Sequence, residues 1–573
     1  MSRRISAPRL PCDDDRTADH VGGHGQVRIP RIPLALAAAL ALGASALAGC
    51  SDGDGRTDGR GGADASAPAR ASAPPPDAWI PGHVAKMSVQ EKVGQLFVPT
   101  FASRADALRT IRRYHVGGLI YFPENFGSPE ETAAQSNALQ KASKIPLVLG
   151  VDEEQGIVTR TPFITRFPGN MALGATADPA QARAAARVTG AELRAVGINL
   201  DYAPVADVNV NPRNPVIGVR SFGSDPARVS RMVTGAVRGY QDAGVAAVAK
   251  HFPGHGDTAT DSHTGLPVIG HDPDTWRKVD APPFEAAIAA GVDAIMTAHI
   301  EVPKLDGSGD PATLSRNVLT GLLRERLGYD GVITTDSLRM EGVRTKYGDG
   351  AVAVRAVQAG ADQLLMPPDL PEAHAAVVAA VRSGKITEQR LDASVTRILR
   401  LKQRRGLFGQ AQADPAKAAS VVGGPQHEAT ARQVAERAVT VVANKGGVLP
   451  LKGRTVAVTG PKAEALAGAL RAQGVRTAAP GSADVTVLTT DDAGAATAAR
   501  VRALGGKPVV VAALGSPYDL DSAGGAAAAV AAYSSGTESL RGLARVLAGT
   551  ANPTGKLPVP AGGQPVGHGL AYG

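Results

Sequence analysis

Short apolar runs alternate with longer amphipathic stretches along most of the chain that follows Trp79. Apolar runs that are separated by helical stretches are typical of parallel strands covered by helices. The pattern therefore predicts a series of strands, each followed by a helix. Eight such runs are present, at residues 95–99, 118–122, 146–152, 197–208, 245–251, 293–300, 331–336 and 361–366.

The starts of the predicted helices carry capping residues. Ser128 is followed by Pro129 and Glu131, which is the order of an N-cap, a first helical residue and a capping-box partner. Asp178 and Asp225 each precede a proline and repeat this order. Helices are therefore expected to begin directly after Ser128, Asp178 and Asp225.

The alternation predicts a fold with two domains. Eight strand–helix pairs within roughly 300 residues favour a TIM-type (β/α)8 barrel over residues 79–410. An open, doubly wound sheet is the competing interpretation, because alternation alone does not establish closure. Residues 411–428 contain many Ala, Gly and Pro residues and are expected to form a linker. Residues 429–573 are expected to form a smaller C-terminal α/β sandwich domain, with apolar runs at 455–458, 485–488 and 509–514.

The first 49 residues have the features of a signal peptide. Arg28 and Arg31 precede an apolar run at 33–47 that is too short for a comfortable membrane span. The run ends in Leu47-Ala48-Gly49-Cys50, which resembles the lipobox of bacterial lipoproteins, where cleavage leaves the cysteine as the lipidated first residue. Residues 50–78 are dominated by Gly, Asp, Ala, Ser and Pro and predict a disordered tether. We therefore expect a secreted protein that is anchored at the outer face of the cell membrane; an ordinary cleaved signal is the alternative.

The composition excludes several other classes of protein. The 61 basic and 53 acidic residues give a net charge of +8, but the Lys and Arg residues are dispersed and form no stripe for nucleic acid. The two cysteines, Cys12 and Cys50, both lie near the N-terminus. The remainder of the chain therefore has no disulfide, thiol nucleophile or cysteine metal ligand.

The segment 250–263 contains three His and two Asp residues, which are possible metal ligands. His251 and His255 have helical spacing, but Pro253 and Gly254 between them interrupt a helix, so the two rings need not share a face. The many Gly and titratable residues favour a mobile active-site loop instead. We expect neither a metal nor a cofactor.

Polar side chains gather where the predicted strands end, which is where the active sites of barrels lie. Cleavage of a glycosidic bond needs a nucleophile or base below the sugar and a proton donor at the leaving oxygen. Asp336 alone is as consistent with a helix cap as with a nucleophile. Together with Asp261 and His263 it suits this chemistry, because a histidine oriented by a carboxylate can act as acid and then as base. The other strand-end residues are Asp152, Glu153, Glu154, Arg160, Arg220, Lys250, His251 and His299.

One segment carries a specific family resemblance. The sequence K-H-F-P-G-H-G-D-T-A-T-D-S-H-T-G-L-P-V-I at 250–269 resembles the signature loop of bacterial β-N-acetylglucosaminidases in glycoside hydrolase family three. Segments at 87–97, 167–168, 202–209, 220–222 and 552–558 are similar to family segments in the same order. The resemblance covers about residues 77–573 and is denser in the barrel than in the second domain.

The resemblance implies a retaining, exo-acting enzyme that hydrolyses terminal β-linked N-acetylglucosamine, from peptidoglycan fragments or chito-oligosaccharides. Asp336 is then the nucleophile that forms a covalent glycosyl-aspartate, and His263 is the acid/base, oriented by Asp261. Glu153-Glu154-Gln155-Gly156-Ile157-Val158 stands where family members usually have Gln-Glu-Gly-Gly-Arg-Val, so this wall of the site differs from the family pattern. The residues implied to bind the terminal sugar are Asp152, Arg160, Arg220, Lys250 and His251.

Three alternatives stay open. A β-glucosidase of this family would resemble the chain in the barrel, but such enzymes typically take their acid from the second domain, unlike the pair formed by Asp261 and His263. An N-acetylglucosaminide phosphorylase is compatible with a histidine acid/base, because phosphate is an anionic acceptor. A lipid-anchored sugar-binding protein without catalysis is the non-enzymatic alternative. Nothing in the sequence indicates the oligomeric state.

The lipobox leads to a direct prediction. Cys50→Ala should move the protein from the membrane fraction to the soluble fraction, because the acyl chains attach to that thiol. Fractionation of cells that express either form, with mass spectrometry of the mature N-terminus, measures this. A variant that stays membrane-bound, together with a wild type that lacks a lipidated Cys50, would contradict the prediction.

Overall fold

The computed structural model describes residues 77–261, 265–344, 346–410 and 412–572. The expected signal peptide, most of the tether, Cys50 and His263 lie outside the described residues. Within the described ranges, no helix is both long and apolar enough to cross a membrane.

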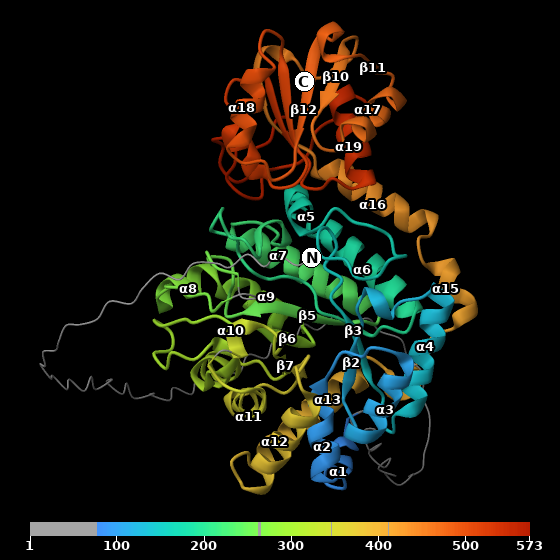
Figure 1. The fold of residues 1–573 in the computed structure, drawn as a ribbon, viewed down its shortest axis with the longest axis vertical. Helices are drawn as coiled ribbons and strands as arrows, with labels where there is room; N and C mark the ends of the chain where they lie inside the picture. Colours follow the sequence, from blue (N-terminus) through green and yellow to red (C-terminus); the bar gives the residue numbers. More distant parts are fainter. Residues whose placement is uncertain (1–76, 262–264, 345, 411, 573) are drawn as a thin grey trace, which may run out of the picture. The chain divides into compact units, whose positions relative to one another are not determined.

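Eight short parallel strands form a closed barrel in the first domain (Figure 1). Strands β2 to β7 pair in chain order, and β1 pairs with β8. The two sheets join where the Ile120 N–H donates to the Pro99 carbonyl at 3.1 Å and the Thr335 N–H donates to the Gln363 carbonyl at 3.0 Å. Closure confirms the barrel and excludes the open sheet. The strands are β1 (Phe97–Val98), β2 (Gly118–Ile120), β3 (Val148–Val151), β4 (Leu200–Asp201), β5 (Ala246–Phe252), β6 (Ala294–Thr297), β7 (Val332–Thr334) and β8 (Leu364–Leu365).

Helices surround the strands, and they begin where the sequence predicts. Ser128 forms a capping box with Glu131, and the side chains of Asp178 and Asp225 accept hydrogen bonds from the first turns of α6 and α7. A π-helix, Asn317–Arg326, connects β6 to β7. The α-helices are α1 (Ile80–Val84), α2 (Val89–Gln95), α3 (Arg104–Tyr114), α4 (Pro129–Ala142), α5 (Asn170–Thr176), α6 (Pro179–Ala195), α7 (Pro226–Asp242), α8 (Pro273–Val279), α9 (Ala281–Ala289), α10 (Glu341–Arg344), α11 (Asp349–Ala359), α12 (Leu370–Arg382), α13 (Glu388–Arg404) and α14 (Leu407–Gln410).

The connection that follows the barrel is more ordered than the expected linker. It contains α15 (Pro415–Val421) and the start of α16 (Pro425–Ala438). The prolines that suggested an irregular segment occupy first helical positions, where a missing N–H removes no helical hydrogen bond. The Asn137 side chain exchanges two hydrogen bonds of 2.8 Å with the backbone of Ala413, which attaches this connection to α4.

The C-terminal domain is an α/β sandwich, drawn in orange and red in Figure 1. Its six-stranded sheet has the order β11-β10-β12-β13-β14-β9, in which only β9 is antiparallel to its neighbour. The three predicted strands are confirmed as β10, β12 and β13. The others were not predicted, since β11 is short and polar and β14 has the sequence Ala-Ala-Val-Ala. The strands are β9 (Thr440–Asn444), β10 (Thr455–Thr459), β11 (Arg476–Thr477), β12 (Val485–Thr490), β13 (Val509–Ala513) and β14 (Ala528–Ala531), and the helices are α17 (Ala463–Ala472), α18 (Ala496–Ala503) and α19 (Thr537–Ala548).

Candidate active site

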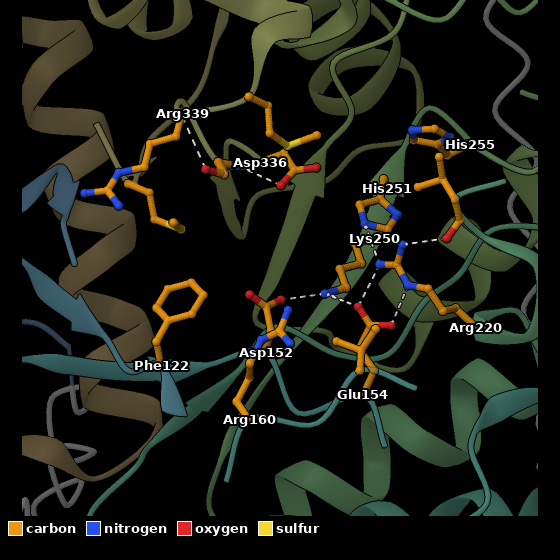
Figure 2. Close-up of a pocket in the computed structure, with 15 residues that line it drawn as sticks. Phe122, Asp152, Glu154, Arg160, Arg220, Lys250, His251, His255, Asp336 and Arg339 are labelled. Atoms are coloured by element: carbon orange, nitrogen blue, oxygen red, sulfur yellow. Dashed lines mark hydrogen bonds and ion pairs between the residues drawn. The ribbon is translucent and has the colours of Figure 1, made fainter. Parts of the chain in front are cut away.

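A cavity of about 390 Å³ opens at the carboxyl ends of the barrel strands (Figure 2). Six of the residues that were given a role from the sequence line it, which confirms that the strand ends converge: Asp152, Arg160, Arg220, Lys250, His251 and Asp336. The remaining lining residues are Phe122, Glu154, Val158, Val216, His255, Ser337, Arg339, Met340 and Met366.

A buried carboxylate organises the charged side of the cavity. The Arg220 guanidinium donates to both oxygens of Glu154 at 2.8 Å, and the Lys250 ammonium lies 2.7 Å from Oε1 of the same residue. Lys250 also donates to Asp152 Oδ1 at 2.7 Å. Burial by itself would raise the pKa of Glu154, but Arg220 and Lys250 hold that pKa well below its usual range. Two cations and two carboxylates therefore form one balanced, ionised cluster.

The same pairing determines the charge of the lysine. Burial would lower the pKa of Lys250, but Asp152 and Glu154 outweigh it and raise the pKa to about 12. The ammonium group is therefore charged at all physiological pH values. Its exposed fraction is only 2%, so it can serve only a group that enters the cavity.

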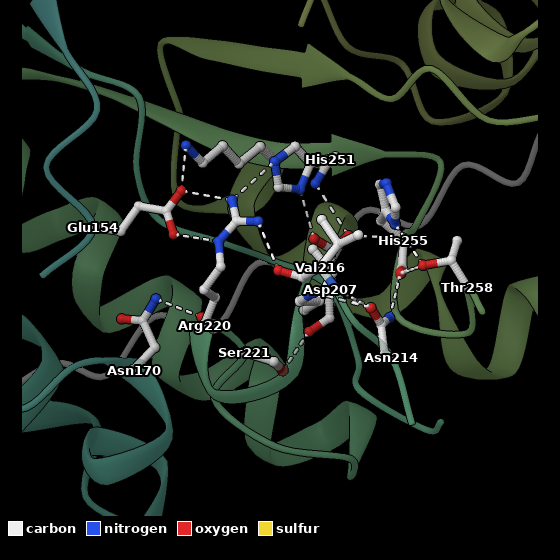
Figure 3. A network of polar contacts seen from close by, with 12 residues as sticks. Glu154, Asn170, Asp207, Asn214, Val216, Arg220, Ser221, His251, His255 and Thr258 are labelled. Atoms are coloured by element: carbon white, nitrogen blue, oxygen red, sulfur yellow. Dashed lines mark hydrogen bonds and ion pairs between the residues drawn. The ribbon is translucent and has the colours of Figure 1, made fainter. Parts of the chain in front are cut away.

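A second buried carboxylate holds His251, near the end of β5, and His255, in the loop that follows (Figure 3). Asp207 accepts a hydrogen bond from the His251 ring at Nδ1, at 2.7 Å, and from the backbone N–H groups of His251 and His255, at 3.1 and 2.8 Å. Because a carboxylate accepts, His251 carries its proton on Nδ1 and presents Nε2 toward Arg220, 3.4 Å away. A Cβ at Gly256 would overlap the carbonyl oxygen of Val208, so glycine is needed for this close approach.

The neighbouring histidine is neutral. Burial, together with the nearby His251, lowers the pKa of His255 to about 4. Its ring Nδ1 lies 3.0 Å from the hydroxyl of Thr258, and its backbone carbonyl accepts a hydrogen bond from Asn214 at 2.9 Å. These contacts fix the ring at the edge of the cavity without adding a charge.

Asp336 follows β7 and faces the cavity. It lies between Lys250 on one side and Phe122 and Arg339 on the other (Figure 2). Its Oδ1 accepts a hydrogen bond from the Ser337 N–H at 2.6 Å. Burial favours the neutral acid, but His251, His299 and the Ser337 N–H outweigh it and lower the pKa of Asp336. The carboxylate is therefore ionised at neutral pH, as a nucleophile must be.

His299 supports the turn that carries this carboxylate. Its Nε2 lies 2.9 Å from the carbonyl oxygen of Ser337, and its Nδ1 lies 2.8 Å from the hydroxyl of Thr313. A carbonyl can only accept, so Nε2 carries the proton. His299 thus lies beneath the site and orients the turn, in agreement with its predicted strand-end position.

Arg160 is brought to the cavity by a buried glutamate. Both the Arg160 and the Thr161 N–H groups donate to Glu153 Oε2, at 2.9 and 2.8 Å. The guanidinium carbon lies 5.9 Å from the ring centroid of Phe122, and the buried Nε has no hydrogen-bond partner. An unsatisfied buried donor at a cavity wall is available to a ligand.

The structure and the sequence differ over which residues complete the site. Asp261 is described but does not line the cavity, and His263 lies outside the described residues. Sequence reasoning assigned no role to Glu154, Asp207 or His255, although each belongs to a strand-end cluster. It also gave no signal for Phe122, Met340 and Met366, because apolar residues at strand ends resemble ordinary core.

Comparison with known proteins gives two family matches. Residues 88–401 match the family described as "Glycosyl hydrolase family 3 N terminal domain", and residues 469–564 match "Glycosyl hydrolase family 3 C-terminal domain". The first match corresponds to the barrel and the second to most of the sandwich domain.

Several relatives resemble the chain. It is 40% identical over 373 residues to beta-hexosaminidase A of Pseudoalteromonas piscicida, covering 60% of this chain and 62% of that protein. It is 37% identical over 385 residues to a beta-N-acetylglucosaminidase/beta-glucosidase of Cellulomonas fimi, covering 65% of this chain and 68% of that protein. The solved structure of a glycoside hydrolase family 3 beta-N-acetylglucosaminidase from Paenibacillus sp. str. FPU-7 has a TM-score of 0.76 at 38% identity, covering 83% of this chain and 99% of that one. The match thus spans less than two thirds of the Pseudoalteromonas protein.

The charge cluster leads to a stability prediction. Glu154→Gln should lower the free energy of unfolding by about 3 kcal/mol at pH 7, because Arg220 and Lys250 lose their shared counter-charge while staying buried. The folded-state pKa of Glu154 lies below its ordinary value of 4.5, so the unfolded chain takes up the proton first as the pH falls. The stabilisation is therefore present above about pH 4.5 and is lost below it.

Chemical denaturation at neutral pH and at several acidic pH values measures this difference. Glu130→Gln removes an exposed carboxylate and should leave stability within about 0.5 kcal/mol of the wild type, which makes it the control. A Glu154→Gln protein as stable as the wild type at pH 7 would show that the cluster makes no net contribution.

Proposed function

The chain belongs to glycosyl hydrolase family 3, and we propose that it is a retaining, exo-acting β-N-acetylglucosaminidase that removes terminal β-linked N-acetylglucosamine. The observation that carries this proposal is the ionised Asp336 carboxylate, which faces a cavity whose other walls hold hydrogen-bonding charges. The names of the Pseudoalteromonas, Cellulomonas and Paenibacillus relatives support the N-acetylglucosaminide substrate.

The charged side of the cavity suits the hydroxyl groups of a terminal sugar. Asp152 can accept from a hydroxyl, while Lys250 and Arg160 can donate to one. Asp152 and Lys250 are already fixed by each other, so these two side chains lose little conformational entropy when a sugar binds. Hydrogen bonds to charged groups also reject ligands that lack the matching hydroxyl.

The proposed reaction proceeds in two steps. The Asp336 carboxylate attacks the anomeric carbon as the bond to the leaving oxygen breaks, and His263 gives its proton to that oxygen, which forms the glycosyl-aspartate. His263, now neutral, then takes a proton from water as the water oxygen attacks the same carbon, which releases Asp336 and the sugar. Asp261 is proposed to orient His263 and to stabilise its charged form.

The cavity favours short substrates. Phe122 is the aromatic residue among the described lining residues that could pack against a sugar, and aromatic residues make up only 4% of the chain. Long glycans usually bind along extended aromatic platforms. We therefore propose exo-action on short chains such as peptidoglycan fragments or chito-oligosaccharides.

The location is a further part of the proposal. The lipobox at Cys50 and the composition of residues 50–78 support a lipid-anchored protein at the outer face of the cell membrane. There, the enzyme would meet cell-wall fragments. The test is the Cys50→Ala fractionation described above.

The substrate preference tests the function directly. The value of kcat/KM for an aryl N-acetyl-β-glucosaminide should exceed that for the matching β-glucoside by more than ~100-fold, about 2.7 kcal/mol of transition-state discrimination. β-Glucosidase activity is the second candidate, because the Cellulomonas relative is named for both activities. Values within tenfold of each other would favour that candidate, and products formed in excess phosphate would identify phosphorolysis.

The nucleophile is tested by substitution and labelling. Asp336→Asn keeps the size of the side chain but removes the charge, so turnover should fall by roughly 10⁴-fold or more, because no glycosyl-aspartate can form. A mechanism-based fluorosugar should label the wild-type peptide that contains Asp336. Retained activity in the variant, with the label on another peptide, would assign the nucleophile elsewhere.

The proton donor is tested by varying the leaving group. His263→Ala should spare substrates with activated leaving groups and should slow poor leaving groups strongly, because only the latter need protonation. Asp261→Ala should show a smaller defect of the same kind. Equal losses for all leaving groups would argue against His263 as the donor.

A further inference from the structure

Two aromatic side chains meet on the outer surface of the first domain. Trp79 and Phe408 are 37% and 38% exposed, and their rings contact each other edge to face at a centroid distance of 4.8 Å. Among the large hydrophobic residues that are exposed in the described ranges, these two are the aromatic ones. Single exposed apolar residues are common on protein surfaces, whereas exposed apolar residues that lie together indicate an interaction surface.

The surface next to this pair carries no net negative charge. The Asp77 carboxylate, at the start of this stretch, lies 3.0 Å from Nε of Arg400, which neutralises it. The other exposed positions along α1 and α14 are small and uncharged: Ala78, Pro81, Gly82, Ala85 and Gly409.

Two cations flank the aromatic pair. The spacing of Trp79, His83 and Lys86 places them along one face of α1 and the turn that continues it, since the Lys86 N–H donates to the His83 carbonyl at 3.0 Å. Arg404 ends α13 and lines, together with Asp77, a cavity of about 640 Å³. Lys86 and Arg404 are both exposed, and neither forms an ion pair within the part of the chain that the structure describes.

This surface lies at the end of the barrel where the strands begin. The 640 Å³ cavity that Asp77 and Arg404 share is also lined by Val292 and Gly331, which lie just before β6 and β7. Helix α1 packs against α13 in the same region (Figure 1). The active-site cavity opens at the opposite ends of the same strands. A partner that covered Trp79 and Phe408 would therefore leave the active site open.

The position of the expected lipid anchor indicates what this partner is. Residues 51–76 alone separate Cys50 from Asp77. A flexible segment of that length spans roughly 28 Å, so a lipid on Cys50 would keep Trp79 close to the membrane. A weak attraction is then enough for docking, because the tether raises the effective concentration of the surface at the lipid. Aromatic side chains enter the headgroup region of a bilayer, and Lys and Arg bind anionic headgroups.

We propose that Trp79 and Phe408, flanked by Lys86 and Arg404, form a surface that docks the barrel onto anionic phospholipids of the membrane that holds the anchor. Docking leaves the active-site cavity facing away from the membrane, where cell-wall fragments can enter it. The inference rests on the location proposed above and extends it, because a flexible tether by itself imposes no orientation.

Quenching of tryptophan fluorescence by brominated phospholipids tests this surface in the full chain. The chain has two tryptophans, and Trp276 is only 2% exposed, so Trp79 is the one that lipid can reach. On vesicles of brominated phosphatidylglycerol the wild type should lose roughly a third of its emission, and Trp79→Phe less than about a tenth. Brominated phosphatidylcholine should quench less, because its headgroup has no net charge to attract Lys86 and Arg404.

Matched variants separate docking from general changes in the protein. Phe408→Ser and Arg404→Gln should each reduce the quenching by about twofold or more. Leu570→Ser removes an equally exposed apolar side chain from the second domain, and Arg432→Gln removes an exposed arginine from α16. Both controls should be quenched as strongly as the wild type. Circular dichroism shows which variants fold, and two independent positions keep the test readable if one variant does not.

The lipid on Cys50 and the quenching are measured separately. A lipidated protein that floats with the vesicles while Trp79 stays unquenched overturns the docking surface and leaves the anchor intact. A protein without lipid whose Trp79 is still quenched contradicts the proposed anchor alone, and a protein with neither contradicts both. None of these measurements uses glycosidase activity, so failure of the proposed reaction is distinguished as well.

Two further results would overturn the docking surface. The first is equal quenching in Phe408→Ser, Arg404→Gln and the two controls. The second is a change in Trp79 emission that follows protein concentration in the absence of vesicles, which would assign this surface to contact between two copies of the chain.

Discussion

The site depends on one buried carboxylate, Glu154, which is shared by Arg220 and Lys250. Two buried cations would repel each other and lose hydration, and neither would keep a fixed position without a counter-charge. Glu154 belongs to the loop after β3, Lys250 to β5, and Arg220 to a short 3-10 helix, Gly218–Arg220, that precedes α7. The ion pairs therefore tie together three separate segments of the barrel and fix the orientation of these charged groups.

The pairing of charges within this cluster affects the electrostatic surroundings of the Asp336 carboxylate. Because Lys250 and Arg220 are paired with Asp152 and Glu154, neither forms a direct ion pair with Asp336 in the described structure. The pKa of its carboxyl is lowered first by His251 and His299, then by the Ser337 N–H, and last by Lys250. A carboxylate bound tightly to a cation would be a poorer nucleophile, so the pairing on the other side of the cavity agrees with the role proposed for Asp336.

The sequence predicted the barrel and several of the residues that line its cavity, because both follow from strand ends. Asp152, Lys250 and Asp336 each follow or end an apolar run, and the barrel brings such positions together. Asp207 could not be assigned, since its partners His251 and His255 lie far along the chain. Helix α15 was missed because a proline at a first helical position looks like a linker residue. Met340 and Met366 also line the cavity, but apolar side chains give no sign of a functional site in the sequence.

Charge also separates the roles of the histidines at the site. His255 has a pKa of about 4, so it stays neutral through the range in which enzymes of this kind work and cannot supply a proton there. His299 is occupied between Ser337 and Thr313 beneath the turn, and His251 directs its protonated nitrogen at Asp207. His251 and His299 are thus both held by partners inside the barrel, and His255 is uncharged at neutral pH. These placements agree with the proposed donor on the loop that carries Asp261. Because a general acid stops working when it loses its proton, the alkaline limb of the pH profile of kcat/KM should report on that donor.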